Sequence, residues 1–163
     1  MTYRSGFGYD IHRLTPGRRL MLGGVHIPSQ LGLEGHSDAD VLLHAICDAL
    51  LGAATLGDIG KHFPNTDPLF KDISSLKLLS MVNDLIMKRS FQIVNIDSTI
   101  VLEKPRIADY VPEMQYNISK TLNLPADVIS VKATTNEGLG SIGKGEGCAA
   151  FAVASLRSLD SGS

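Results

Sequence analysis

The stretch DADVLLHAICDALLGA, residues 38–53, predicts a helix that is apolar on almost every side. Its apolar residues are Val41, Leu42, Ala45, Ile46, Ala49, Leu50 and Ala53, extended around the helix by Leu43, Cys47 and Leu51. Asp40, His44 and Asp48 follow one another at one-turn intervals and form a narrow polar stripe. We expect Ser37 or Asp38 to cap the helix. Because such a helix should be buried, its polar stripe should face a partner, a cavity or a metal ion.

Around this helix the sequence alternates strand-like and helical segments. The strand-like segments fall near residues 3–12, 91–102, 128–135 and 147–156, and the helical ones near 38–55, 75–89 and 109–122. LMLGGVHI, residues 20–27, contains the Gly-Gly pair of a short hairpin. The alternation predicts an α/β (α+β) fold with one small domain, in which helices cover one or both faces of a sheet. We expect the domain to span residues 1–157 and residues 158–163 to form a flexible tail.

Composition excludes several classes of function. The 163 residues carry 15 Lys and Arg against 17 Asp and Glu without a block of like charges, which argues against a general binder of nucleic acid or membrane surfaces. Cys47 and Cys148 lie far apart in apolar runs, as buried thiols do in a reducing compartment. The first residues lack the apolar core of a signal peptide, and no apolar run is long enough to span a membrane. We therefore expect a cytoplasmic protein.

A candidate metal site comes from GYDIH, residues 8–12. Side chains alternate along a strand, so Asp10 and His12 share one face. With His44 from the polar helix stripe they make an Asp-His-His set, which leaves a fourth tetrahedral zinc position open for a substrate oxygen. Asp40 and Asp48 lie one turn before and after His44, and either could support it behind the metal or be a structural partner. The alternative is structural: an Asp and a His that bond nearby backbone, and a histidine satisfied within the core.

The glycine-rich segment GLGSIG, residues 138–143, matches two nucleotide-binding patterns only superficially. A dinucleotide site needs a following helix and a further strand, and too little chain follows. A phosphate loop needs Ser or Thr where Gly145 stands. A flexible turn between two strands is the simpler interpretation. Just before it, Thr134, Thr135 and Glu137 could contact phosphate and hold Mg²⁺, unless they are ordinary strand and loop residues.

Taken together, four segments resemble the 2-C-methyl-D-erythritol 2,4-cyclodiphosphate synthase family of the non-mevalonate isoprenoid pathway. The segments are GYDIHRL, LGGVHIP, EGHSDADVLLHAICDALLGAATLGDIGKHFPNTDP and VKATTNEGLGSIGKGEG, and they cover nearly the whole chain in order. The resemblance implies a small domain with a mixed sheet packed against helices, assembled as a homotrimer with active sites between subunits. It also implies a lyase that uses zinc and magnesium or manganese.

The resemblance also implies the role of each site residue. Asp10, His12 and His44 take the zinc positions, and Glu137 takes that of the Mg²⁺ or Mn²⁺ ligand. His36 and Thr135 are the implied catalytic residues, which stabilise the transition state. The residues implied to bind substrate are Asp10, His12, His36, Ser37, Asp58, Ile59, Gly60, Phe63, Pro64, Asn65, Thr66, Asp67, Leu102, Glu103, Lys104, Pro105, Arg106, Ile107, Ala108, Ala133, Thr134, Thr135, Asn136, Glu137, Ser141 and Lys144.

Within these segments the chain departs from common family residues at a few positions. Asn65 stands where aspartate is common and Arg106 where lysine is common, and both keep hydrogen bonding or charge. Ser141 and Lys144 replace an aromatic residue and an arginine that some members carry near the threefold axis. This last pair bears on the isoprenoid-diphosphate binding attributed to that axial cavity in some relatives.

The implied reaction is an intramolecular phosphoryl transfer. The 2-phosphate of 4-diphosphocytidyl-2-C-methyl-D-erythritol 2-phosphate attacks the β-phosphorus, CMP leaves, and a cyclic diphosphate closes. Two metal ions suit this reaction because they neutralise anionic oxygens that must approach one another. The same residues leave two alternatives: a metal-dependent phosphohydrolase that uses water, and a trimeric binding module with structural histidines.

Overall fold

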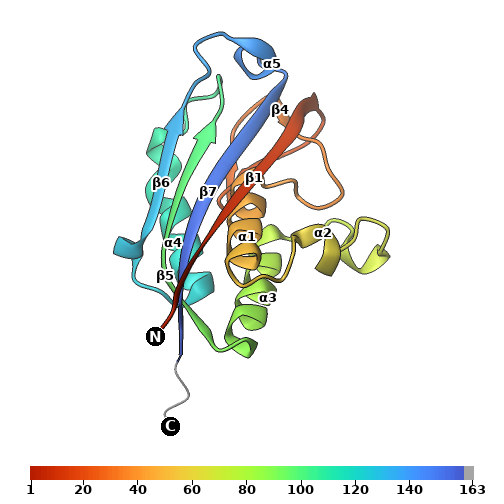
Figure 1. Ribbon diagram of the computed structural model, residues 1–163. Helices are drawn as coiled ribbons and strands as arrows, with labels where there is room; N and C mark the ends of the chain where they lie inside the picture. Colours follow the sequence, from red (N-terminus) through yellow and green to blue (C-terminus); the bar gives the residue numbers. More distant parts are fainter. Residues whose placement is uncertain (160–163) are drawn as a thin grey trace.

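The computed structural model describes residues 1–159, which form a mixed sheet covered by helices (Figure 1). The five-stranded sheet has the order β4-β1-β7-β5-β6. Its strands are β1 (Tyr3–Pro16), β4 (Leu31–Leu33), β5 (Phe91–Val101), β6 (Ile129–Thr134) and β7 (Gly147–Ser158). Only β5 and β6 pair in parallel, whereas β7 pairs antiparallel with both β1 and β5. The sheet is therefore mixed, as the family resemblance implies.

Three longer helices pack on one face of this sheet: α1 (Val41–Ala53), α3 (Ser75–Lys88) and α4 (Val111–Leu122) (Figure 1). Shorter elements complete the fold. They are the two-stranded sheet of β2 (Leu20–Leu22) and β3 (Val25–Ile27), the turns α2 (Ile59–His62) and α5 (Gly140–Gly143), and the 3-10 turns η1 (Pro68–Phe70), η2 (Ala108–Tyr110) and η3 (Ala126–Val128). None of the helices within residues 1–159 is both long and apolar enough to cross a membrane.

The central helix α1 is buried between the sheet and α3, as its apolar sequence predicts. It lies unusually close to β1, because two glycines of that strand face its backbone. A Cβ atom on Gly8 would stand 1.8 Å from the carbonyl oxygen of Ala45, and one on Gly6 would stand 2.0 Å from that of Ala49. Glycine is required at both positions for this approach. The close packing fixes the polar stripe of α1 relative to β1.

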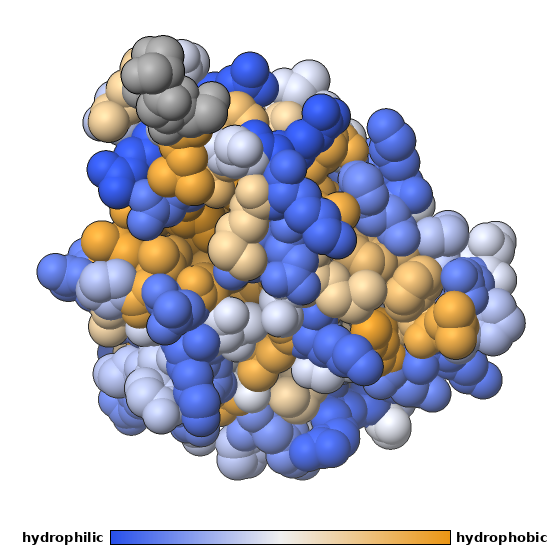
Figure 2. All heavy atoms as spheres, turned by 90° about the horizontal axis from the view of Figure 1, so that it is seen from below, coloured by the Kyte–Doolittle hydropathy of each residue, from blue (hydrophilic) through white to orange (hydrophobic). Residues whose placement is uncertain are grey.

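The sheet face opposite the helices carries exposed apolar side chains. Phe7 and Tyr9 on β1 contact Phe151 on β7, with ring centroids 6.3 and 5.0 Å apart. Phe7 is 63% exposed and Val153 is 46% exposed. Viewed from below, the molecular surface also shows orange apolar areas between blue polar ones (Figure 2). No element within residues 1–159 covers the aromatic residues of the outer sheet face.

Most element predictions are confirmed, with local corrections. The three long helices, the four long strands and the Gly-Gly hairpin all form. The expected cap of α1 was wrong: the N-cap is Asp40, whose side chain accepts a hydrogen bond from Leu43 N. The glycine-rich segment contains the helical turn α5 rather than an irregular turn. β7 continues through Ser158, and residues 160–163 of the expected tail lie outside the described part, so the tail stays a prediction.

Cys47 and Cys148 are buried and unpaired, as the sequence predicts. Burial raises the pKa of both thiols, that of Cys148 to about 12, so both stay protonated and unreactive.

Candidate metal centre and substrate site

Asp10, His12 and His44 meet between β1 and α1. One ligand atom from each lies within 4.8 Å of the others. Asp10 Oδ2 is 3.0 Å from His12 Nε2 and also 3.0 Å from His44 Nδ1. Strand alternation brings Asp10 and His12 to the same face, and the polar stripe of α1 brings His44 to them. The structure thus assembles the predicted set from residues 34 positions apart.

Each imidazole also has a polar contact through its other ring nitrogen, the one that faces away from Asp10. His12 Nδ1 lies 2.7 Å from the carbonyl oxygen of Glu34, which can only accept, so Nδ1 carries the hydrogen. Nε2, which faces Asp10, is therefore the atom of His12 left to bind a metal ion. His44 points Nδ1 at Asp10, while its Nε2 faces Ser37 and Ser75 on the other side.

The charges in the cluster favour a cation. Burial alone would raise the pKa of Asp10, but hydrogen bonds and charge from His12 and His44 outweigh it and lower that pKa to about 2. Burial alone would lower the pKa of His12, but hydrogen bonding and charge from Asp10 raise it above its ordinary 6.5. A carboxylate that attracts two histidine protons is equally suited to share a metal ion with them.

A buried nitrogen of His12 that lacks a hydrogen bond in the described part of the chain tests whether the three residues fit a zinc ion. His12 Nε2 is buried and, within residues 1–159, has no hydrogen bond of good geometry, although Asp10 lies 3.0 Å away. A buried nitrogen without a well-aligned hydrogen bond is costly, and a metal ion would remove that cost. Two imidazole nitrogens and one carboxylate oxygen are ordinary zinc ligands that leave a fourth position open. The residues therefore fit a zinc ion.

A cavity of about 170 Å³ opens beside the cluster. Its lining includes nine of the predicted metal and substrate residues: Asp10, His12, His36, Ser37, His44, Ile59, Gly60, Phe63 and Asn65. Phe70, Ile73 and Leu78 complete the wall and were not predicted. His36 Nε2 is buried and has no hydrogen-bond partner among residues 1–159, which leaves it available to a ligand.

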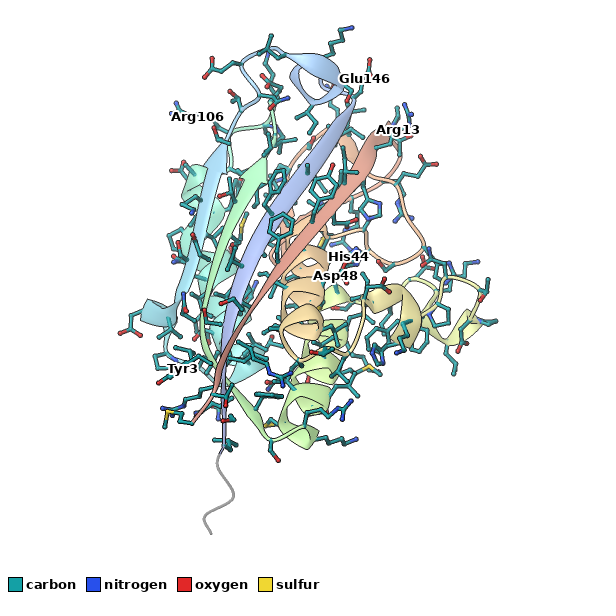
Figure 3. The ribbon with its side chains drawn as sticks, in the orientation of Figure 1. Tyr3, Arg13, His44, Asp48, Arg106 and Glu146 are labelled. Atoms are coloured by element: carbon teal, nitrogen blue, oxygen red, sulfur yellow. The ribbon has the colours of Figure 1, made fainter. Side chains whose placement is uncertain are left out.

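The predicted loop at Asp58–Gly60 is fixed to α1. Asp48 Oδ1 accepts a hydrogen bond of 2.8 Å from Ile59 N. Asp58 caps α2 by accepting from Lys61 N at 3.0 Å. Asp48 therefore positions a cavity wall, and within residues 1–159 it makes no hydrogen bond to His44, so its role is the structural one of the two expected. In Figure 3, His44 and Asp48 lie together on α1, on the side that faces α2.

The other expected partner, Asp40, also serves the fold. Its oxygens accept hydrogen bonds from Gly23 N at 3.0 Å, Gly24 N at 2.8 Å and Leu43 N at 3.1 Å. They tie the β2–β3 hairpin to the start of α1. The groups that do contact the far side of His44 are Ser37 and Ser75. Sequence reasoning missed Ser75 because it lies 31 residues from His44, at the start of another helix.

The chain is similar to known proteins along nearly its whole length. The profile described as the YgbB family matches residues 3–157. The chain belongs to the YgbB family. A relative from Syntrophobacter fumaroxidans, called 2-C-methyl-D-erythritol 2,4-cyclodiphosphate synthase, is 59% identical over 95% of this chain and 98% of its own length.

Two solved structures superpose closely on this chain. The bifunctional IspDF of Campylobacter jejuni gives a TM-score of 0.94 at 43% identity, covering 98% of this chain and 43% of that longer one. IspF of Plasmodium falciparum in its CDP complex gives a TM-score of 0.84 at 35% identity, covering 96% of both chains. The second relative is similar over its whole length and was solved with a cytidine nucleotide.

Pro64, Thr66 and Asp67 lie in the segment between α2 and η1, next to the cavity residues Phe63 and Asn65. Most other predicted residues of the YgbB chain form a second group, away from the metal cluster. Parallel pairing of β5 and β6 puts Val101 opposite Thr134, and Leu102 N donates to the carbonyl oxygen of Thr134 at 3.0 Å. Glu103 Oε1 accepts from Asn136 N at 2.6 Å. The group contains residues 102–108 and 133–137 and none of them lines the cavity of the metal cluster.

The separation of the two groups is visible in Figure 3, where Arg106 lies beyond the β6 edge and His44 lies behind β1. Within the second group, Thr135 Oγ1 accepts from Glu137 N at 3.2 Å, and Glu137 has a positive φ of 53°. The Glu137 carboxylate has no hydrogen-bond or ion-pair partner among residues 1–159. Ser141 lies in α5 and Lys144 directly follows it, so both stand above the ends of β6 and β7 (Figure 1).

Proposed function

We propose that this chain performs the cyclodiphosphate synthase reaction of the non-mevalonate isoprenoid pathway at the Asp10–His12–His44 centre. In this reaction the 2-phosphate oxygen of 4-diphosphocytidyl-2-C-methyl-D-erythritol 2-phosphate bonds to the β-phosphorus. The bond from that phosphorus to the bridging oxygen breaks, and CMP leaves. Family membership supports the activity, and the observation that carries the site is the three ligand atoms within 4.8 Å of one another.

The zinc half of the site binds and orients phosphate. Asp10, His12 and His44 would hold a zinc ion, which would supply positive charge to a phosphate oxygen of the substrate. His36 and Ser37 line the same cavity and can donate hydrogen bonds to the reacting phosphates. Phe63 and Phe70, with centroids 5.3 Å apart, form an apolar wall that limits water. These residues hold the nucleophile in line for attack, which is the main requirement of phosphoryl transfer.

The second half would bind the cytidine diphosphate. Thr135 offers a hydroxyl, and the carboxylate of Glu137, a hard ligand, would hold Mg²⁺ or Mn²⁺, which would supply positive charge to the diphosphate. Residues 102–108 and 133–137 are the proposed cytidine and phosphate contacts. The CDP complex of the Plasmodium falciparum relative supports a cytidine-linked substrate, because CDP contains the nucleotide part of it.

We infer that the two halves come from different subunits of a homotrimer. The cavity of about 170 Å³ is smaller than the roughly 300–1,000 Å³ typical of ligand sites, so one chain does not enclose the substrate. The exposed aromatic residues of the outer sheet face offer an apolar surface for neighbouring subunits. A cyclic assembly would bury that face and bring one subunit's second half to its neighbour's zinc half. A cytoplasmic location remains a prediction.

Product analysis tests the proposed function. Purified protein is incubated with the cytidylated substrate and divalent metal, with and without a chelator, and the products are separated. We expect CMP and a cyclic diphosphate that disappear when metal is removed. Release of inorganic phosphate would instead indicate the phosphohydrolase alternative. Absence of any metal-dependent turnover would favour a binding module.

A further inference from the structure

The side of His44 that faces away from Asp10 contacts a buried serine at the start of α3. His44 Nε2 lies 3.0 Å from Ser75 Oγ, and Ser75 is 0% exposed. The Ser75 hydroxyl also hydrogen-bonds to Asp38 Oδ1. We propose that Asp38 and Ser75 are positioning residues that fix the tautomer of His44 and so present its Nδ1 lone pair to the metal. This inference rests on the proposed metal site.

The hydrogens in this chain of contacts can be assigned one after another. Asp38 Oδ2 accepts from Ser75 N at 3.0 Å and Oδ1 accepts from Asp40 N at 3.3 Å, so both oxygens act as acceptors. The single hydrogen of the Ser75 hydroxyl must then point to Asp38 Oδ1. Ser75 Oγ has only lone pairs left for His44, and Nε2 must carry the hydrogen. A neutral imidazole with hydrogen on Nε2 has its lone pair on Nδ1, the atom facing Asp10.

Ser37 alone does not determine which nitrogen of His44 carries the hydrogen. Its Oγ lies 3.2 Å from His44 Nε2 and accepts from Ala39 N at 3.1 Å. Its own hydrogen has no assigned acceptor among residues 1–159, so this hydroxyl can either donate to Nε2 or accept from it. Only Ser75 has its hydrogen committed elsewhere. Without Ser75, Ser37 could donate to Nε2 and stabilise the other tautomer, whose Nδ1 hydrogen blocks the metal position.

Asp38 connects this local effect to the fold. Ser74, the N-cap of α3, makes no side-chain capping bond, and Asp38 supplies an acceptor to the first turn instead. The loop before α1 is thereby held to α3, with His44 between them. His12 has the same support from a backbone carbonyl, which no side-chain substitution removes. The tautomer of His44, unlike that of His12, therefore depends on side chains that can be removed by substitution.

Ser75→Ala tests the proposal, with Ser74→Ala as the matched control because Ser74 is the neighbouring serine, is exposed and makes no side-chain cap bond. Zinc affinity is measured by chelator competition, with thermal melting to check the fold. Loss of a partner behind a ligating histidine typically weakens metal binding about 10–100-fold, and we expect a loss in that range for Ser75→Ala and none for Ser74→Ala.

Imidazole ¹⁵N shifts of the metal-free protein give a second readout that a merely structural role would not move. We expect Nε2 of His44 to carry a hydrogen in the wild type, and in Ser75→Ala we expect a rise in the form whose only hydrogen is on Nδ1, bonded to Asp10. Asp38→Asn should act alike, because Ser75 N and Ser75 Oγ donate to different oxygens of Asp38 and an amide keeps only one of them. This variant replaces Ser75→Ala if that protein does not fold. Wild-type zinc affinity and an unchanged tautomer in a folded variant would overturn the proposal. Failure of the wild type to bind zinc would overturn the metal site instead.

Discussion

At the scale of single residues, His44 combines two roles that can be separated. It is 7% exposed, and its ring lies between Asp10 on one side and Ser37 and Ser75 on the other. The apolar residues around it on α1 are fully buried and pack independently of the ring. Removal of the imidazole should therefore affect metal binding much more than folding.

We predict that His44→Ala abolishes turnover while the protein stays folded. One of three protein ligands is lost, and two ligands hold zinc poorly. Zinc content after dialysis, CMP release and thermal melting are measured together. His26→Ala is the control, because His26 is an exposed histidine in β3 outside the cavity. An active His44→Ala protein with full zinc occupancy would refute the ligand assignment.

Zinc affinity of the metal-free protein should fall as the pH is lowered, with His12 setting the midpoint. The pKa of His12 is raised above 6.5, and its proton must leave before Nε2 can bind metal. Below that pKa we expect affinity to fall by about tenfold per pH unit, and above it to level off. Asp10 makes no contribution in this range, since its pKa is about 2. Chelator competition across pH measures the midpoint, and a midpoint below 6.5 would contradict the prediction.

The metal ligands could be predicted from sequence because each follows a simple periodicity. Asp10 and His12 are two positions apart in a strand, and His44 lies on the one polar stripe of an apolar helix. Their partners follow no such rule. Asp38 and Ser75 are 37 positions apart and meet only because α3 begins beside the loop before α1. Asp40 has the same helical spacing as Asp48, but backbone amides of a distant hairpin take its oxygens.

At the scale of elements, the close contact of α1 with β1 decides whether the metal ligands meet. Hydrophobic patterning predicts that this helix is buried, but it does not give the distance between helix and strand. That distance depends on Gly6 and Gly8, which in sequence are simply small residues in a strand. Their role becomes clear only from the carbonyl oxygens of α1 that they face.

We predict that Gly8→Ala destabilises the protein by at least about 3 kcal/mol, the upper part of the usual range for overpacking. The new Cβ would stand 1.8 Å from the Ala45 carbonyl oxygen, which belongs to the helix backbone and cannot move alone. The free energy of unfolding is measured by urea titration.

Gly52→Ala is the matched control for Gly8→Ala. Gly52 lies in α1, and a Cβ there would meet nothing within 4 Å, so we expect a gain of up to about 1 kcal/mol from helix propensity. Equal stability of the Gly8→Ala protein and the wild type would show that α1 can move away from β1 without loss.

At the scale of the whole molecule, one chain presents two partial sites and an uncovered apolar face. The sequence predicts the elements and both groups of residues, yet no local pattern tells which groups share a cavity. That depends on sheet order: two strands, β7 and β5, separate β1 from β6. The zinc half adjoins β1, and the Thr135–Glu137 half follows β6. One subunit therefore cannot bring its own halves together without disrupting the sheet.

A mixing experiment tests the shared site. His44→Ala lacks the zinc half and Thr135→Ala lacks the second half, so each protein alone should be inactive. When equal amounts are unfolded and refolded together, random assembly of a head-to-tail ring should restore about a quarter of the sites. A site works only where a Thr135→Ala subunit supplies the zinc half and a neighbouring His44→Ala subunit supplies Thr135. Each choice has a probability of about one half in an equal mixture, which gives the expected quarter.

The refolded mixture is assayed for CMP release beside wild-type protein refolded in the same way, which corrects for losses during refolding. Mass spectrometry counts the mixed trimers. Activity near a quarter of the wild type supports halves that come from different subunits. If mixed trimers form and CMP release stays at background, each subunit builds its own site. The small cavity beside the metal cluster would then have to open far enough for Thr135 and Glu137 of the same chain to reach it, against the sheet order that holds them apart.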